Sequence, residues 1–472
     1  MGQEITSSRF GLQDFAEFKA RLEAETRLLG QWFRDGLFAD SHSVGGFELE
    51  CCLLDKQGSP APINQQFLDK FDNPLVVPEL ATFNLEINST ARPLEGQVFS
   101  RMAHELDRLW TQCNQTAAGL DAQLGMIGIL PTLGPEHLTL ANMSPLNRYR
   151  ALNEQVFKLR QGKPVELDID GEAPLHLQHE DVMLESAATS FQIHLQVNAD
   201  QAAGIYNLSK MVSGPMVAIS ANSPFLFGHE LWEETRIPLF EQAISVGASD
   251  LTKRVSFGVR YVGESMLENF TANLERYPIL LPRLMDEPIE SLAHLRLHNG
   301  TIWRWNRPLI GFDQQGKPHL RIEHRVVPAG PSVADSIANA ALYFGLVKGL
   351  EPEYDELEGR IGFLQARGNF YAAARFGLDA ELLWINQRPV NVVKLFNEVL
   401  MPKARLGLQR LGVDQAEITQ WLDIIQGRLD TKRTGADWQR AWVRRYGNDS
   451  QGLIQAYLQH QQSGNPVHEW SV

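Results

Sequence analysis

The chain has few of the features that mark secreted, membrane-spanning or nucleic-acid-binding proteins. Only three of its 472 residues are cysteines, and they form no Cys-x-x-Cys pair, which argues against a disulfide framework or a cysteine-rich metal site. No apolar run reaches the ~18 residues of a membrane span, and the first ten residues lack the apolar core of a signal peptide. The net charge is −14, without a basic run. We therefore expect a cytoplasmic protein that binds neither nucleic acid nor membrane.

Hydrophobic periodicity predicts an α+β fold, with a curved, mainly antiparallel sheet and helices packed outside it. Residues 12–33 and 98–124 have the apolar spacing of amphipathic helices. Further strands are predicted at 126–130, 255–261 and 301–305. We expect three units: an N-terminal helical segment (1–40), a catalytic domain (41–350) and a helical C-terminal region packed on it (351–472).

Four short runs alternate apolar residues with polar ones. Successive side chains of a strand point to opposite faces, so each run predicts one apolar and one polar face. The polar positions hold acids, a histidine, arginines and amides, but none of the Lys, Ser or Thr that usually populate a solvated sheet face. The runs cover residues 47–52, 83–88, 191–197 and 320–326.

The polar positions form a set of candidate metal ligands. Glu48 and Glu50 lie two apart on the first run, and two carboxylates on one side repel each other unless a cation lies between them. Mg²⁺ prefers hard oxygen ligands and keeps substrate phosphates in its shell, so we expect Mg²⁺ here, with Mn²⁺ as an alternative. The other runs add Glu86, Glu323 and the imidazole of His194.

Arginines on the fourth run complete this predicted face. Arg321 and Arg325 supply guanidinium groups that suit phosphate oxygens. Carboxylates, metal and arginines together suit phosphoryl transfer, where the enzyme mainly positions groups and neutralises charge. For a single strand, a solvated face is the simpler interpretation, but four runs with the same bias argue against it. His324 falls on the apolar side and is predicted to be a structural, hydrogen-bonded histidine.

Six short motifs occur in order along the chain and together resemble a known family. They resemble the glutamate–cysteine ligase type of carboxylate–amine ligase, which is related in fold to glutamine synthetase. The resemblance spans about residues 45–350. The motifs are GGFELE (45–50), NLEIN (84–88), QIHLQ (192–196), ANSPF (221–225) with Arg236 downstream, WRWNRP (303–308) and RIEHR (321–325).

The resemblance implies an ATP- and Mg²⁺-dependent ligase that forms an amide through an acyl phosphate, with a role in glutathione biosynthesis. Glutamate and an amine such as cysteine would be its substrates, and a homo-oligomer is compatible with the sequence. The implied catalytic residues are Arg325, which would stabilise the transferring phosphoryl group, Glu323 and Arg236. The implied metal ligands are Glu48, Glu50, Glu86, His194 and Glu323, and the implied nucleotide-binding residues are Arg307, Arg321, Gln192 and Gln196.

Two other functions remain open at this stage. A phosphotransferase of the guanidino-kinase type shares the general architecture but leaves no amide. A nucleotide- or amino-acid-binding protein without activity would keep the fold, although the intact set of acids, histidine and arginines argues against it.

Overall fold

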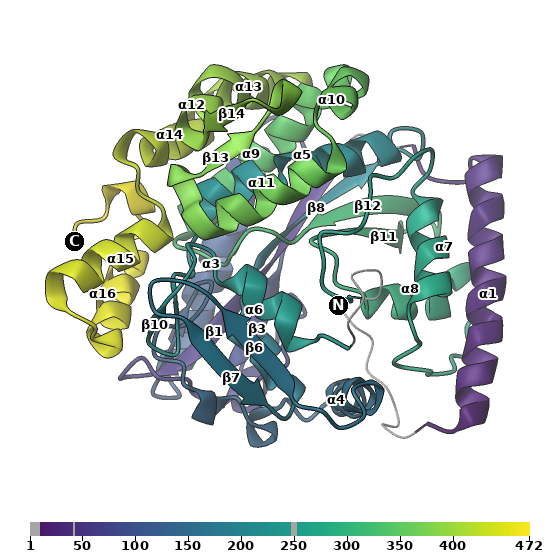
Figure 1. The fold of residues 1–472 in the computed structure, drawn as a ribbon, viewed down its shortest axis with the longest axis horizontal. Helices are drawn as coiled ribbons and strands as arrows, with labels where there is room; N and C mark the ends of the chain where they lie inside the picture. The colour runs from purple at the N-terminus through teal and green to yellow at the C-terminus, as the bar shows by residue number, and fades with distance from the viewer. Residues whose placement is uncertain (1–9, 41–42, 247–252) are drawn as a thin grey trace.

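The computed structural model describes residues 10–40, 43–246 and 253–472, and its centre is an eight-stranded sheet (Figure 1). The strand order is β11-β12-β8-β1-β3-β2, with β4 and β5 pairing with the two ends of β1. Every pairing is antiparallel, which confirms the predicted α+β fold with a mainly antiparallel sheet. The strands are β1 (Val44–Asp55), β2 (Val76–Pro78), β3 (Asn84–Asn88), β4 (Arg92–Pro93), β5 (Ala122–Gly125), β8 (Phe191–Val197), β11 (Asn306–Phe312) and β12 (Pro318–His324).

Two layers of helices cover one face of the sheet. The inner layer is α5 (Ala202–Ser220) and α9 (Val333–Leu350), which contact both the sheet and each other. Because α9 lies between the sheet and other helices, nearly all of it is buried. Helix α3 (Val98–Ala118) lies beside α9 and also contacts β5, and the outer layer is α11 (Phe363–Phe376), α13 (Met401–Arg410) and α14 (Gln415–Thr431). We call this covered side the convex face.

The segment between β5 and β8, together with α6, lies on the opposite side, which we call the concave face. This part contains α4 (Asn147–Leu159), the hairpin of β6 (Val165–Ile169) and β7 (Leu175–His179), and α6 (Arg236–Ala243), which contacts β6 (Figure 1). Other elements in the middle of the chain are α2 (Asn64–Leu68), the hairpin of β9 (Phe225–Leu226) and β10 (His229–Glu230), α7 (Leu267–Arg276), α8 (Ala293–Gly300) and α10 (Tyr354–Arg360).

Both ends of the described chain consist mainly of helices. The first helix, α1 (Leu12–Asp35), stands at the edge of the molecule against α7 and α8 (Figure 1). The buried pair of Glu25 and His294 fixes it there, with Oε1 and Nδ1 2.6 Å apart. The C-terminal part adds the hairpin β13 (Glu381–Leu383) and β14 (Pro389–Asn391), α12 (Val392–Leu395), α15 (Gly435–Tyr446) and α16 (Ser450–Ser463). The three predicted units stay a prediction, and residues 1–9 of the first lie outside the described residues.

Several predicted elements have other boundaries than expected. The helix predicted to reach residue 124 ends at Ala118, because a turn at Gly119 to Asp121, with φ of 57° at Asp121, leads into β5. The strand predicted at 126–130 forms only an isolated bridge from Ile129 to Ala188.

The strands predicted at 255–261 and 301–305 are also wrong. Gly258 has φ of +98°, which interrupts any extended run at 255–261. The second run starts at Thr301, the residue that ends α8, and pairing with β12 begins only at Asn306. In the described part of the chain, no helix is both long and apolar enough to span a bilayer.

Candidate active site on the concave face of the sheet

The register of the sheet brings the polar positions of four distant runs together. His194 on β8 lies between Gly46 of β1 and Glu323 of β12, as the pairings of these strands show. Glu50 of β1 is paired with Glu86 of β3, and Arg307 of β11 with Glu323. The antiparallel register therefore gathers residues separated by up to 277 positions (46 to 323) into one patch.

A candidate metal centre lies at the middle of this patch. One ligand atom each of Glu48, His194 and Glu323 lies within 4.8 Å of the other two. His194 Nε2 is 3.3 Å from Oε1 of Glu48 and 3.8 Å from Oε1 of Glu323. Both ring nitrogens of His194 are buried and lack a hydrogen bond from the described residues. Buried polar atoms are normally satisfied, so this imidazole among carboxylates fits a site built for a divalent cation.

Two arginines hold Glu323 in place. Arg307 donates from Nε and Nη2 to the two carboxylate oxygens, at 2.7 and 2.9 Å, and Arg325 Nη1 lies 3.1 Å from Oε2. Burial alone would raise the pKa of Glu323, but the charges of Arg307 and Arg325 outweigh it and lower that pKa to about 2. Glu323 is therefore an anion at every physiological pH and remains available as a ligand.

Glu50 connects the candidate metal centre to the start of β8. Its carboxylate accepts hydrogen bonds from the backbone N–H of Ser190 at 2.6 Å and from Gln192 Nε2 at 2.8 Å. The amide oxygen of Gln192 in turn accepts from Arg325. Burial and the nearby charge of Glu79 raise the pKa of Glu50 to about 7. Carboxyl groups whose pKa values are raised by burial and by neighbouring acids are concentrated at functional sites.

A second group of acids surrounds Glu50, and two of them were not found from the sequence. Burial, together with the charges of Glu48 and Glu79, raises the pKa of Glu86 well above its usual value. Burial and the charges of Glu79 and Glu50 raise the pKa of Glu185 to about 8. Glu79 follows β2 in a loop and Glu185 lies in a short 3-10 turn, so neither shows the strand alternation that marked the others.

The remaining predicted residues occupy different places. Arg321 and Gln196 are opposite each other on β12 and β8, on the same side as Glu323 and His194. Arg236 is buried, with 2% of its surface exposed, and donates from Nε to Glu234 and from Nη2 to the carbonyl oxygens of Arg325 and Val326. It thus contacts the backbone that carries Arg325, and its predicted contact with substrate stays a prediction.

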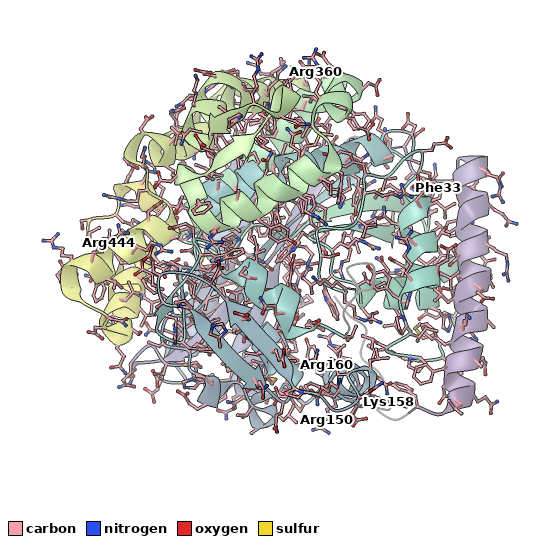
Figure 2. The ribbon with its side chains drawn as sticks, in the orientation of Figure 1. Phe33, Arg150, Lys158, Arg160, Arg360 and Arg444 are labelled. Atoms are coloured by element: carbon pink, nitrogen blue, oxygen red, sulfur yellow. The ribbon has the colours of Figure 1, made fainter. Side chains whose placement is uncertain are left out.

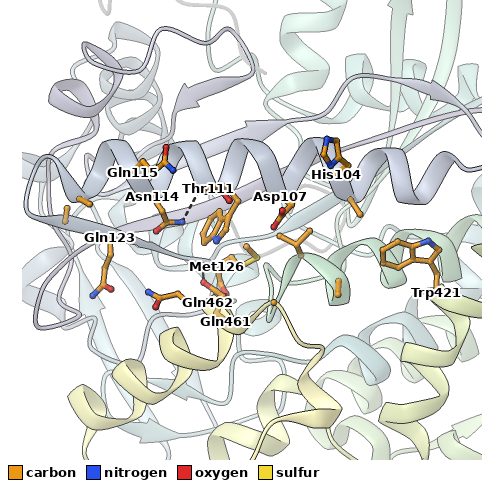
Figure 3. Close-up of a pocket in the computed structure, with 17 residues that line it drawn as sticks. His104, Asp107, Thr111, Asn114, Gln115, Gln123, Met126, Trp421, Gln461 and Gln462 are labelled. Atoms are coloured by element: carbon orange, nitrogen blue, oxygen red, sulfur yellow. Dashed lines mark hydrogen bonds between the residues drawn. The ribbon is translucent and has the colours of Figure 1, made fainter.

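A cavity of about 790 Å³ lies away from this cluster (Figure 3). It is formed by α3, by the N-terminus of α9, by α14 and by the C-terminal end of α16, and its lining includes Trp110, Trp421 and Gln461. None of the predicted catalytic, nucleotide-binding or metal-binding residues lines it. The size of a cavity is therefore not what identifies the candidate site in this molecule.

Comparison with known proteins identifies a family. The family model of glutamate–cysteine ligase family 2 matches residues 44–461. No curated protein matches the sequence. Among solved structures, a glutamate–cysteine ligase of Francisella tularensis in complex with AMP superposes with a TM-score of 0.57 at 10% identity, covering 92% of this chain and 90% of that one. This likeness supports the fold.

Two more distant structures also align. A bifunctional glutathione synthetase from Pasteurella multocida gives a TM-score of 0.47 at 12% identity over 94% of this chain and 55% of that one. The complex of the prokaryotic ubiquitin-like protein Pup with its ligase PafA gives 0.40 at 11% identity, over 91% and 77% of the two chains. Both scores are too low to establish a shared fold.

Proposed function

Since the chain belongs to glutamate–cysteine ligase family 2, and is thus an ATP-dependent ligase that forms an amide bond, we propose that the concave face is its active site. The resemblance predicted from six motifs is confirmed by this family, and the phosphotransferase and non-catalytic alternatives are set aside. One observation carries the proposal: Glu48, His194 and Glu323 converge within 4.8 Å although they come from three strands.

The proposed first metal site consists of Glu48, His194 and Glu323. Two carboxylates and one imidazole suit Mg²⁺ or Mn²⁺, and a bound cation would neutralise triphosphate oxygens. Although burial would raise the pKa of Glu48, its interactions with nearby charges, above all with His194, lower it well below the usual value. Glu48 and Glu323 thus both stay ionised, as metal ligands must be.

A second cation would fit the neighbouring acids. Burial and the charges of neighbouring acids raise the pKa values of Glu50 and Glu86, and Glu79 contributes to both shifts. A cation between these three carboxylates would reverse the repulsion and keep all three ionised. We therefore assign Glu50, Glu79 and Glu86 to a second site on the same face.

The proposed reaction has two steps. A carboxylate oxygen of the first substrate attacks the γ-phosphorus of ATP, the bond to the β-phosphate oxygen breaks, and ADP leaves. The amine of the second substrate then attacks the acyl carbon, phosphate departs with the electron pair of the C–O bond, and the nitrogen loses a proton. Arg325 would stabilise the charge of the transferring phosphoryl group, and the contacts of its guanidinium with Glu323 and Gln192, beside the proposed first metal site, support this role.

Arg307, Arg321, Gln192 and Gln196 stay proposed nucleotide-binding residues. Arg321 is suited to phosphate because its buried Nε has no hydrogen-bond partner in the described part of the chain. Burial and the charges of Arg296 and Arg307 lower its pKa, while Glu48 and Glu323 counteract them. An anionic ligand would satisfy this guanidinium.

We propose that the γ-carboxylate of glutamate is joined to cysteine or a related amine, in the cytoplasm. The family supports this substrate class. The test is ADP release by the purified protein with ATP, Mg²⁺, glutamate and a panel of amines, followed by mass spectrometry of the product. We expect ADP release that requires both substrates and a product lighter than their sum by one water. Absence of nucleotide turnover with a broad panel of acids and amines would contradict the proposal.

A matched pair of variants connects the activity to the site. Glu48→Gln removes a proposed ligand, whereas Glu95→Gln changes an exposed acid near β4. We expect the first to lose turnover and Mn²⁺ binding while remaining folded, and the second to behave like the wild type. Full activity of Glu48→Gln would refute the first metal site without refuting the ligase activity.

A further inference from the structure

Two buried cations on the convex side have no acidic partner among the described residues. Lys210 of α5 is 1% exposed, and its Nζ donates to the carbonyl oxygen of Phe257 at 2.6 Å. Arg304, just before β11, is 6% exposed, and its Nη1 is buried without a hydrogen bond in the described part of the chain. By contrast, Arg150, Arg360 and Arg444 project from the surface into solvent (Figure 2).

An unpaired buried charge is costly, and the usual remedies are a counter-ion or loss of the charge. Burial and the charge of Arg304 together lower the pKa of Lys210 to about 7. Arginine cannot use that remedy because its guanidinium stays protonated in proteins. The carboxylate that lines the same space, Glu268, is already bound to Arg260 Nη2 at 2.5 Å and to the backbone N–H of Glu264 at 2.8 Å. An anion from outside the chain would compensate the buried charge of Arg304.

The two cations line one small cavity of about 40 Å³, which we call the α5 pocket. Gly258 keeps it open, because a Cβ at this position would lie 3.0 Å from Lys210 Nζ. The aromatic rings of Tyr206 and Phe257 lie 4.9 and 5.1 Å from the same Nζ. The lining of the pocket includes Tyr206, Lys210, Gly258, Arg260, Arg276 and Arg304.

The α5 pocket is separate from the candidate active site. The hydroxyl of Tyr206 donates to the carbonyl oxygen of Asn306, and the Asn306 amide nitrogen donates to Ser213 on α5, so this end of α5 packs on the convex side of β11. Arg307, the next residue, belongs to the other face and holds Glu323. Arg260, whose side chain is 57% exposed, and Arg276 form a basic entrance.

We propose that the α5 pocket binds a small oxyanion of the phosphate class, held between Lys210 Nζ and the guanidinium of Arg304. The volume admits one compact group and is too small for a nucleotide. Two donors of unlike geometry, an ammonium and a planar guanidinium, suit an oxyanion with several acceptor oxygens. Because Arg304 is three residues from Arg307, an anion bound on the convex side would stabilise the start of β11.

The test measures the unfolding temperature with inorganic phosphate against sodium chloride of equal ionic strength. Phosphate should raise the unfolding temperature of the wild type by about 2 °C or more. The active site also binds phosphate groups, so Arg325→Gln serves as the comparison variant and should keep most of this rise. Lys210→Met and Arg304→Met should lose it, with phosphate binding weakened roughly tenfold or more. Arg388→Met, a change of an exposed arginine, is the matched control.

The variants also give a result that a purely structural role would not. Without phosphate, Lys210→Met should unfold at the same or a higher temperature than the wild type, because it removes an uncompensated buried charge. A phosphate response that disappears in Arg325→Gln but persists in Lys210→Met and Arg304→Met would overturn the proposal, as would a wild type that does not respond. If Lys210→Met fails to fold, Arg304→Met decides alone.

Discussion

The two faces of the central sheet each contain a buried histidine, and the two histidines have opposite surroundings. His194 and His324 lie on adjacent strands, β8 and β12, one register position apart, but point to different faces. His324 is fully buried, its Nδ1 lies 2.7 Å from Oδ1 of Asn306, and its ring stacks on Tyr343 at 4.2 Å. His194 stands among carboxylates with both ring nitrogens unsatisfied by the described residues. The prediction that His324 is structural is confirmed.

Electrostatics separates the faces more sharply than burial does. Burial lowers the pKa of His324 to about 3, so it stays neutral and acts as a packing group with one hydrogen bond. On the concave face, burial is as deep, but acids and arginines are concentrated there. Outside the α5 pocket, the convex side thus contributes mainly packing, whereas the concave face concentrates acids and arginines, which we propose bind a cation and phosphate groups. The following predictions test this division, from the largest expected effect to the smallest.

Replacing Glu323 by Gln should have the largest effect on the activity of the concave face. The change removes a proposed metal ligand and leaves Arg307 and Arg325 without their carboxylate. We expect kcat to fall by roughly 10³-fold, measured by ADP release, while circular dichroism shows a folded protein. Near-normal turnover would place the chemistry elsewhere. Glu290→Gln, at an exposed position, should leave kcat unchanged.

The pH dependence of the unfolding free energy should reveal the raised pKa of Glu50. Its carboxyl pKa is about 7 in the fold against 4.5 for the free group. A folded state that holds its proton longer than the unfolded state loses stability as pH rises through this interval, by up to about 3 kcal/mol. In denaturant titrations with a chelator, unfolding free energy should therefore decline from pH 4.5 to 7 more steeply in the wild type than in Glu50→Gln. Mg²⁺ should reduce that difference, because it binds the ionised carboxylate. Equal slopes in the two proteins would contradict the assignment.

The two histidines give the sharpest comparison within one sheet. His194→Gln should weaken Mn²⁺ binding roughly 10- to 100-fold with little change in stability. His324→Leu should leave Mn²⁺ affinity unchanged but lower the unfolding free energy by about 1–3 kcal/mol, because Asn306 loses its partner. Calorimetric metal titration of both variants measures the Mn²⁺ affinity, and chemical denaturation measures the unfolding free energy. If both variants changed the same property, the proposed division between the faces would be wrong.

A small change on the convex side should affect stability alone. Ser332 caps α9, because its Oγ accepts a hydrogen bond from the backbone N–H of Asp335 at 3.1 Å. Ser332→Ala should cost about 1 kcal/mol of unfolding free energy without changing kcat. A loss of activity at unchanged stability would show that α9 takes part in more than support.

Strand alternation could be predicted from the sequence, because it depends only on neighbouring residues. The alternation placed Glu48, Glu50, Glu86, His194 and Glu323 on one face, and the structure brings them together. It could not reveal Glu79 or Glu185, which reach the same acids from a loop and a 3-10 turn. Nor could it show that Arg304, inside a run that was predicted to be a strand, would face Lys210 across a pocket. Such contacts depend on the tertiary course of the chain.

The most direct test of the central claim is anomalous diffraction from a crystal soaked with Mn²⁺ and a non-hydrolysable ATP analogue. The account predicts an anomalous peak within coordination distance of Glu48, His194 and Glu323, with the triphosphate on the same face near Arg325. A crystal in which manganese and nucleotide bind elsewhere, leaving these three side chains without a metal, would contradict it.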